Sequence, residues 1–217
     1  MSEHSFSCTR RRCLMAAALL PLLAACGKKP KAQSIARGAT VLAFGDSVTY
    51  GTGAAPGEDW PTRLAALSGW RVINAGIPGD TAEAGKQRFG ALLEEHRPAL
   101  VLIEIGGNDF LRRRNPKAVK EDIRGMIAAA RSSGAVVVLV AVPELSLLAA
   151  VARRPSDAPL YAELAKEENV LLIEEVFSDI LARPELCADQ IHPNAAGYRQ
   201  MAEGFATALR KSGLLAG

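Results

Sequence analysis

The stretch TVLAFGDS, residues 40–47, decides the fold. An almost wholly apolar run of strand length ends there in Gly-Asp-Ser. A strand without polar alternation is buried on both faces, which is typical of a parallel sheet covered by helices. Ser47 would then stand at the first turn of the next element, where a serine is either a helix cap or a nucleophile. The rest of the chain has to distinguish these two roles.

Similar apolar runs recur along the chain, at residues 40–44, 71–75, 100–105, 136–142 and 170–173. Segments with helical periodicity separate and follow them, at residues 60–67, 81–96, 116–132, 160–167 and 194–211. Short buried strands that alternate with helices predict an α/β fold, a three-layer, flavodoxin-like arrangement with a five-stranded parallel sheet. Ligands of such folds gather at the carboxyl ends of the strands.

The composition predicts one globular domain. The 217 residues are 49% hydrophobic and 23% charged, which suits a single domain with a real core. The net charge is only +3, and residues 1–25 carry three arginines against one glutamate, so the remainder is close to neutral. Basic residues gather only in short patches such as Arg112-Arg113-Arg114. We therefore expect no nucleic-acid partner, and we expect a monomer.

Residues 1–25 have the layout of an export signal rather than of a folded element. Three arginines precede an apolar run at 13–25, which is shorter than the ~20 residues that a membrane-spanning helix needs. The arginines also loosely resemble a twin-arginine signal, so the export route is left open. The polar, basic residues after Cys26 read as a tether, which makes residues 26–38 the linker and residues 39–217 the folded domain.

The end of this signal, Leu23-Ala24-Ala25-Cys26, resembles the lipobox of bacterial lipoproteins. The resemblance implies cleavage before Cys26, diacylation of its thiol and N-acylation of the new terminus, and hence membrane attachment through Cys26. Gly27 rather than Asp follows, which implies the outer membrane of the bacterial cell envelope, facing the periplasm. Cys8 and Cys13 would leave with the signal, so only Cys187 would remain and no internal disulfide is possible.

Three polar, glycine-rich loops follow the first three predicted strands, at residues 45–51, 74–80 and 106–109. In a parallel sheet these loops converge at one edge. A serine nucleophile there needs a base, and the histidines leave few choices. His4 lies in the signal and His96 at a helix end where a surface role is expected, which leaves His192.

Asp189 precedes His192 by three residues, close enough in a loop to accept a hydrogen bond from the imidazole. The same segment can equally be an ordinary helix start that Asp189 and Asn194 mark, with His192 exposed. The segment alone does not distinguish these two interpretations. An acyl-transfer site also needs donors for an oxyanion. The backbone of Gly79, the side chain of Asn108 and the amide of Ser47 meet that need.

Other chemistries fit these residues less well. Position 49 is Thr, so the G-x-S-x-G elbow of α/β-hydrolases is absent. The glycine-rich residues 51–57 match neither G-x-G-x-x-G nor a phosphate-binding G-K-S/T pattern. Two histidines and one cysteine in the mature chain are too few for a usual zinc site. We therefore expect neither a metal nor an organic cofactor.

The motifs resemble, in order and spacing, the sequence blocks of the SGNH (GDSL) hydrolases, and within that family the chain is most similar to bacterial thioesterases, lysophospholipases and arylesterases. The matching residues are Gly45-Asp46-Ser47, Gly79, Gly107-Asn108-Asp109, Asp189 and His192.

This resemblance implies an esterase that acts on carboxylic ester or thioester bonds. Ser47 would be the nucleophile, His192 the base and Asp189 its orienting partner. Ser47, Gly79 and Asn108 would form the oxyanion hole.

The substrate is left open at this point, between a small-molecule ester and a lipid ester. Residues 142–151 are apolar, and in the family this region lies over the acyl-binding groove, although an ordinary amphipathic helix would look the same. An O-acetylesterase acting on carbohydrate or peptidoglycan is an alternative. A non-catalytic envelope lipoprotein that binds ligands in a hydrolase-like cleft is an alternative of another class.

Overall fold

The computed structural model describes Met1, residues 34–144 and residues 155–216. The rest of the predicted signal, Cys26 and residues 27–33 of the tether lie outside the described residues, as does most of the apolar segment 142–151. Residues Ala32–Gly217 form one compact unit. In the described part of the chain, no helix is both long and apolar enough to cross a membrane.

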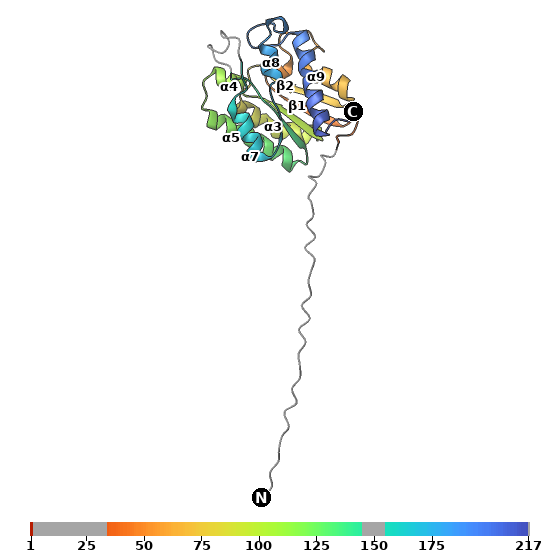
Figure 1. Cartoon of the computed structure of the whole chain (residues 1–217), viewed down its shortest axis with the longest axis vertical. Coiled ribbons are helices and arrows are strands. Elements are labelled where there is room, and N and C mark those ends of the chain that lie inside the picture. Colours follow the sequence, from red (N-terminus) through yellow and green to blue (C-terminus); the bar gives the residue numbers. More distant parts are fainter. Residues whose placement is uncertain (2–33, 145–154, 217) are drawn as a thin grey trace. The chain divides into compact units, whose positions relative to one another are not determined.

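A five-stranded, all-parallel sheet forms the centre of the domain, with strand order β2-β1-β3-β4-β5 (Figure 1). This is the flavodoxin-like order, so the predicted fold class is confirmed. The strands end within a residue or two of the predicted limits. Their bounds are β1 Thr40–Gly45, β2 Arg71–Gly76, β3 Leu100–Glu104, β4 Val136–Val140 and β5 Leu171–Ile173.

The helices that cover the sheet pack in two groups on either side of it, α2, α8 and α9 in one and α3, α5 and α7 in the other. Three short helices, α1, α4 and α8, were not predicted, because a single turn or two is too short to show a helical period. The bounds are α1 Ser47–Tyr50, α2 Trp60–Ser68, α3 Ala82–His96, α4 Gly107–Leu111, α5 Pro116–Ser132, α7 Pro159–Glu168, α8 Val176–Leu181, the 3₁₀ turn η1 Pro184–Leu186 and α9 Ala195–Ser212.

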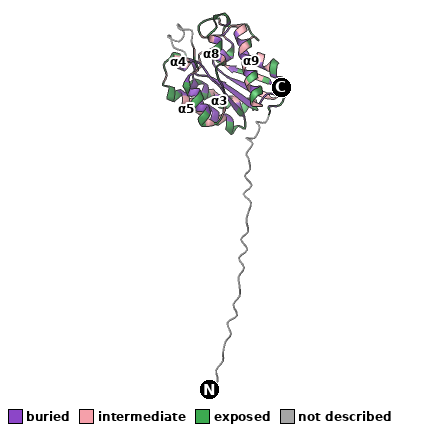
Figure 2. Cartoon of the chain, viewed as in Figure 1, coloured by how far each residue is buried: buried purple, intermediate pink, exposed green. Residues whose placement is uncertain are grey.

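The core lies against both faces of β1 and β3, whose side chains are almost all inaccessible to solvent (Figure 2). On one face the ring of Phe44 meets Phe89 edge to face at 4.8 Å, and on the other Trp60 meets Phe205 at 5.0 Å. Each such buried side chain stabilises the fold by roughly 1.5–3 kcal/mol. The apolar run that opened the sequence analysis is therefore β1, an interior strand of the sheet that lies between β2 and β3.

The folded domain begins earlier than residue 39. Ile35, placed in the tether by the sequence, is buried against the C-terminal residues. Its amide donates to the Leu214 carbonyl at 2.8 Å, and its carbonyl accepts a hydrogen bond from the Trp70 indole at 3.3 Å. A single apolar residue in a polar, basic stretch carries no periodic signal, so the sequence pattern missed this contact.

Gly45 allows β1 and β3 to approach each other closely at their carboxyl ends. It is paired in register with Glu104. A Cβ atom at this position would overlap both the Glu104 carbonyl oxygen and the Thr49 hydroxyl. Only glycine therefore fits between the end of β3 and the turn that carries Ser47.

We expect Gly45→Ala to lower the free energy of unfolding by about 1–3 kcal/mol, because the overlapping backbone must move. Gly90→Ala is the matched control: Gly90 lies inside α3 with nothing within 4 Å of an added Cβ. That change should raise the free energy of unfolding by about 0.5–1 kcal/mol. Urea titrations measure both, and equal unfolding midpoints for the two variants would contradict the packing described at Gly45.

Candidate active site

Ser47 is the first residue of α1, directly after β1. The helix cap is not Ser47 but Asp46, whose Oδ1 accepts a hydrogen bond from the Val48 amide at 3.0 Å. The serine hydroxyl is therefore not used to begin the helix. It is free to face the loops that follow the other strands.

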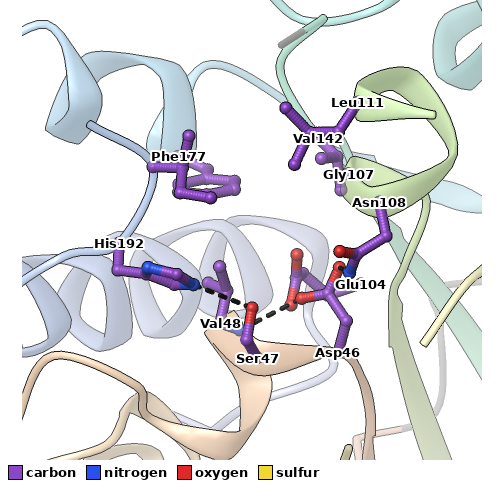
Figure 3. A pocket seen from close by; sticks show the side chains of 11 residues that line it. Asp46, Ser47, Val48, Glu104, Gly107, Asn108, Leu111, Val142, Phe177 and His192 are labelled. Atoms are coloured by element: carbon purple, nitrogen blue, oxygen red, sulfur yellow. Dashed lines mark hydrogen bonds between the residues drawn. The ribbon is translucent and has the colours of Figure 1, made fainter. Parts of the chain in front are cut away.

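Ser47 Oγ lies 2.9 Å from His192 Nε2, and His192 Nδ1 lies 2.8 Å from Asp189 Oδ2 (the serine and histidine are drawn in Figure 3). The three side chains thus form one continuous hydrogen-bonded series. Of the two interpretations of the 189–194 segment, the structure supports the one in which Asp189 contacts the imidazole.

The Asp189 carboxylate is held by more than the histidine ring. Its Oδ1 accepts hydrogen bonds from the backbone amides of Ile191 at 2.9 Å and His192 at 2.8 Å. Partial burial favours the neutral acid, but the hydrogen bonds from the imidazole and these amides outweigh it and hold the Asp189 pKa below its ordinary value. The group is therefore an anion that fixes the orientation of the ring.

Asn194 does begin α9, as the helix-start interpretation expected. Its Oδ1 accepts hydrogen bonds from the Ala196 and Gly197 amides, each at 3.0 Å. Gly53 lies beneath the same loop, where a Cβ would crowd the Pro193 carbonyl oxygen at 2.6 Å. Helix capping and close backbone packing together place His192 over the end of β1.

Asn108, in the first turn of α4, connects the three loops at the carboxyl edge of the sheet. Its Nδ2 donates to Asp46 Oδ2 at 3.2 Å and to the Asp80 carbonyl at 3.0 Å. The loops after β1, β2 and β3 therefore converge as the sequence predicted. Asn108 and Ser47 line the same cavity.

Gly79 lies in the loop after β2, beside this group but not in the cavity wall. Its φ of 85° is in the left-handed region that favours glycine. Its carbonyl accepts a hydrogen bond from Arg112 Nη2 at 3.1 Å, whereas its amide has no acceptor among the described residues. The structure therefore places Ser47, His192 and Asn108 around one cavity. Gly79 is not part of the lining, but it directly precedes Asp80, whose carbonyl accepts a hydrogen bond from Asn108.

The cavity beside Ser47 has a volume of about 270 Å³, including space open to solvent. One side is polar, with Asp46, Ser47, Glu104, Asn108 and His192, and the other is apolar (Figure 3). The apolar wall consists of Val48, Leu111, Val142, Phe177 and Ile191. Such a site can hold an apolar group with its reacting end next to the serine.

Several residues that support the site were missed by the sequence analysis. Arg88 Nε donates to Asp80 Oδ2 at 2.7 Å, Arg88 Nη2 donates to the Gly45 carbonyl at 3.1 Å, and the guanidinium lies 4.3 Å from the centre of the Phe44 ring. Arg88 thereby ties the loop after β2 to the end of β1. A lone arginine in a helical pattern looks like a surface residue, so no sequence signal could have identified it.

Buried acids are the other missed feature. Asp46, Glu104 and Asp109 are each at most 3% exposed. Asp109 accepts hydrogen bonds from the Ala82 amide at 2.8 Å and from Arg114 at 3.0 Å. Glu104 did have a signal, because it is a single acid within the apolar run 100–105.

Asp46 has a strongly altered acidity. Burial is the main cause and raises its pKa to about 6, although the Val48 amide, His192 and the Asn108 side chain act in the opposite direction. The neighbouring Asp109 raises it further. Asp46 is therefore an anion at neutral pH, but one that a modest fall in pH would protonate.

Neither a second base nor a metal site is evident in the described residues. His96, at the end of α3, lies 3.8 Å from Glu95 and does not line the cavity. No three His, Cys, Asp or Glu side chains of residues 34–144 and 155–216 are arranged to hold a metal ion.

Comparisons with known proteins show the family to which the chain belongs. Residues 43–200 match the GDSL-like Lipase/Acylhydrolase family. The thioesterase 1/protease 1/lysophospholipase L1 of Escherichia coli is 33% identical over 176 residues, covering 79% of this chain and 83% of that protein. An arylesterase of Vibrio mimicus is 34% identical over 179 residues, covering 79% and 88%. The crystal structure of TesA, 32% identical, superposes with a TM-score of 0.69 over 80% of this chain and 99% of that one.

The raised pKa of Asp46 predicts a change of stability with pH. In the unfolded chain an aspartate titrates near 3.9, so the folded state binds this proton more tightly and its contribution is present below about pH 4 and lost as the pH rises through 6. Asp46→Asn keeps the helix cap but has no such proton. From pH 4 to 7 the free energy of unfolding of the wild type should fall by about 2 kcal/mol relative to the variant.

Urea titrations of both proteins at the two pH values measure this difference. Every other titrating group is common to both proteins, so the comparison reports on Asp46 together with its effect on the neighbouring Glu104, whose pKa the Asp46 charge raises. The same difference between wild type and variant at pH 4 and pH 7 would show that the Asp46 carboxyl is not perturbed.

Proposed function

The chain belongs to the GDSL-like lipase/acylhydrolase family and is an ester-bond hydrolase, and from this premise we propose that Ser47, His192 and Asp189 are its catalytic triad. The observation that carries the proposal is the series of hydrogen bonds from Ser47 Oγ through His192 to Asp189, at 2.9 and 2.8 Å. Serine hydrolases need this arrangement of nucleophile, base and orienting acid.

In the proposed reaction, His192 Nε2 takes the hydroxyl proton as Ser47 Oγ attacks the carbonyl carbon of an ester or thioester. The resulting tetrahedral intermediate collapses, the imidazolium gives its proton to the departing alkoxide or thiolate, and an acyl-enzyme remains on Ser47. A water molecule then gives a proton to the same imidazole and attacks the acyl-enzyme. Collapse of the second intermediate releases the acid and returns the proton to Ser47.

We assign the oxyanion hole to the amides of Ser47 and Gly79 and the side chain of Asn108. Two observations support a role of Gly79 as an oxyanion donor. Its amide has no acceptor among the described residues, and it directly precedes Asp80, whose carbonyl contacts Asn108. Asn108 donates to both Asp46 and the Asp80 carbonyl, so an oxyanion would take over one of these contacts. Exchange of one acceptor for another leaves the amide paired in both states.

The apolar wall of the cavity supports an acyl chain as the part of the substrate beside Ser47. The relatives are a thioesterase and lysophospholipase, an arylesterase and an esterase by name. We therefore propose carboxylic esters and thioesters of small molecules or lipids as the substrate class. The acyl-enzyme route makes the same use of Ser47 for each of them.

We expect Ser47→Ala and His192→Ala to lower kcat/KM on p-nitrophenyl esters by about 10³-fold or more, because the nucleophile or its base is lost. His96→Ala serves as the control and should hydrolyse the same esters at the wild-type rate. A His192→Ala variant with near-wild-type activity would overturn the triad. A wild-type protein inert toward a panel of esters of varied acyl length and leaving group would favour a ligand-binding module instead.

Membrane attachment through Cys26 is a further part of the proposed function. It rests on the sequence Leu23-Ala24-Ala25-Cys26 and on the spacer that follows. One acyl chain binds a membrane only marginally, whereas three chains anchor it firmly. Because the folded domain extends to Ile35, residues 27–34 are the spacer, which reaches about 26 Å at ~3.3 Å per residue when extended.

Cys26→Ala should leave kcat/KM on soluble esters unchanged while the protein no longer sediments with membranes. Fractionation of bacterial cells that carry each form, followed by immunoblotting, measures the distribution. Wild-type protein found entirely in the soluble periplasmic fraction would refute the lipoprotein assignment and leave the esterase assignment intact.

A further inference from the structure

Glu104 is a wholly buried acid in the lining of the cavity that contains the proposed nucleophile, Ser47. It is the last residue of β3, its side chain is 0% exposed, and it lines the same cavity as Ser47. None of the steps proposed above uses it. A buried acid in an active-site cavity has a functional or a positioning role more often than a neutral packing role.

Among the described residues, Glu104 has too few hydrogen-bond donors around it to stabilise a buried negative charge. Its Oε2 accepts a hydrogen bond from the Thr49 hydroxyl at 2.7 Å, and its Oε1 has no partner among the described residues. The buried Asp109 nearby, in contrast, is paired with Arg114 at 3.0 Å. A buried carboxylate with one donor and no cation is costly, whereas an uncharged carboxylic acid needs far less solvation.

Asp46, which lines the same cavity as Glu104, is surrounded by hydrogen-bond donors. Figure 3 draws the two carboxyl groups at the polar end of the cavity. Asp46 receives one hydrogen bond from the Val48 amide and one from Asn108, so its partners are donors that suit an anion. Two adjacent buried carboxyl groups do not both ionise readily, and the donors select Asp46 as the charged member.

We propose that Glu104 is a positioning residue that acts as a neutral carboxylic acid: it holds Thr49, and with it the turn of Ser47, while Asp46 carries the negative charge next to the serine. This role rests on the proposed function of Ser47. Thr49 is the third residue of α1, so its hydrogen bond to Glu104 ties the helix that begins with Ser47 to the end of β3.

The groups that face Glu104 are consistent with a neutral state. Burial first and the charge of Asp46 second raise its pKa well above the ordinary value. Burial is the main cause that raises the pKa values of the phenols of Tyr161 on α7 and Tyr198 on α9. Both phenols therefore stay uncharged and add no charge near Glu104. His192 and Asp109 act on the neighbouring Asp46.

A dependence on pH follows from this role. Because the folded state holds the proton more tightly than the unfolded chain, the stabilising contribution of Glu104 is present at low pH and is lost as the pH rises toward its raised pKa. Loss of the proton would also place a second negative charge behind Ser47. Both stability and rate should therefore fall on the alkaline side for a reason that is specific to Glu104.

Glu104→Gln is the decisive variant, because glutamine has the shape of the neutral acid, with an acceptor for Thr49 and a donor in place of the hydroxyl. We expect its kcat near neutral pH to be within about twofold of wild type, and its kcat to exceed that of wild type increasingly as the pH rises. Its urea midpoint should also rise relative to wild type with increasing pH. Glu104→Ala, which leaves the Thr49 hydroxyl unpaired, should lower kcat by about 10²-fold with little change in KM.

Asp109→Asn is the matched control, since it makes the same acid-to-amide change at a buried acid that is paired with a cation. It should lower the urea midpoint at every pH, because Arg114 loses its buried partner and keeps only Asp122 and Glu83. A Glu104→Gln protein as inactive as Glu104→Ala, or one whose rate and urea midpoint follow the wild-type pH dependence, would overturn the proposal. If the wild type hydrolyses no ester, the proposed function fails while the urea measurements still decide whether Glu104 is neutral.

Discussion

The close approach of β1 and β3 at Gly45 is the constraint on which the site depends. Because no side chain stands between the two strand ends, the Thr49 hydroxyl reaches Glu104 at 2.7 Å and α1 turns immediately after Asp46. The same proximity brings Asn108, at the start of α4, within 3.2 Å of Asp46. A parallel sheet delivers the loops to one edge, but this contact sets their spacing there.

Charge is distributed among the buried acids according to the donors that surround each one. Asp109 is paired with Arg114, and Asp46 receives hydrogen bonds from an amide and from Asn108, whereas Glu104 has only the Thr49 hydroxyl. Asp189, at the surface of the same site, is held as an anion by three hydrogen bonds. Because Arg114 neutralises Asp109 and Glu104 is proposed to be uncharged, Asp46 is the one of these three buried acids whose negative charge has no cation partner among the described residues. A second such charge would oppose the negative charge that develops during acyl transfer.

The parts of the molecule that the sequence predicted are those with repetitive or local signals. Long apolar runs predicted the strands, and the loops after them placed Ser47 and Asn108 at one edge, whereas His192 was selected because the other histidines were unsuitable. Contacts between residues far apart in the chain were not predictable, such as that of Thr49 with Glu104 or that of Ile35 with Leu214. The short helices α1 and α4 show no period, and the position of Gly79 outside the cavity lining depends on the exact path of its loop.

The most direct test of the account is to trap the acyl-enzyme. The protein is mixed with a p-nitrophenyl ester, quenched in acid within one turnover, digested and analysed by mass spectrometry. The account predicts the mass of the acyl group on the peptide that contains Ser47 in the wild type, and no such adduct in His192→Ala or Ser47→Ala. An acyl group found on another residue, or ester hydrolysis by the wild type with no adduct on Ser47 under any quench time, would contradict it.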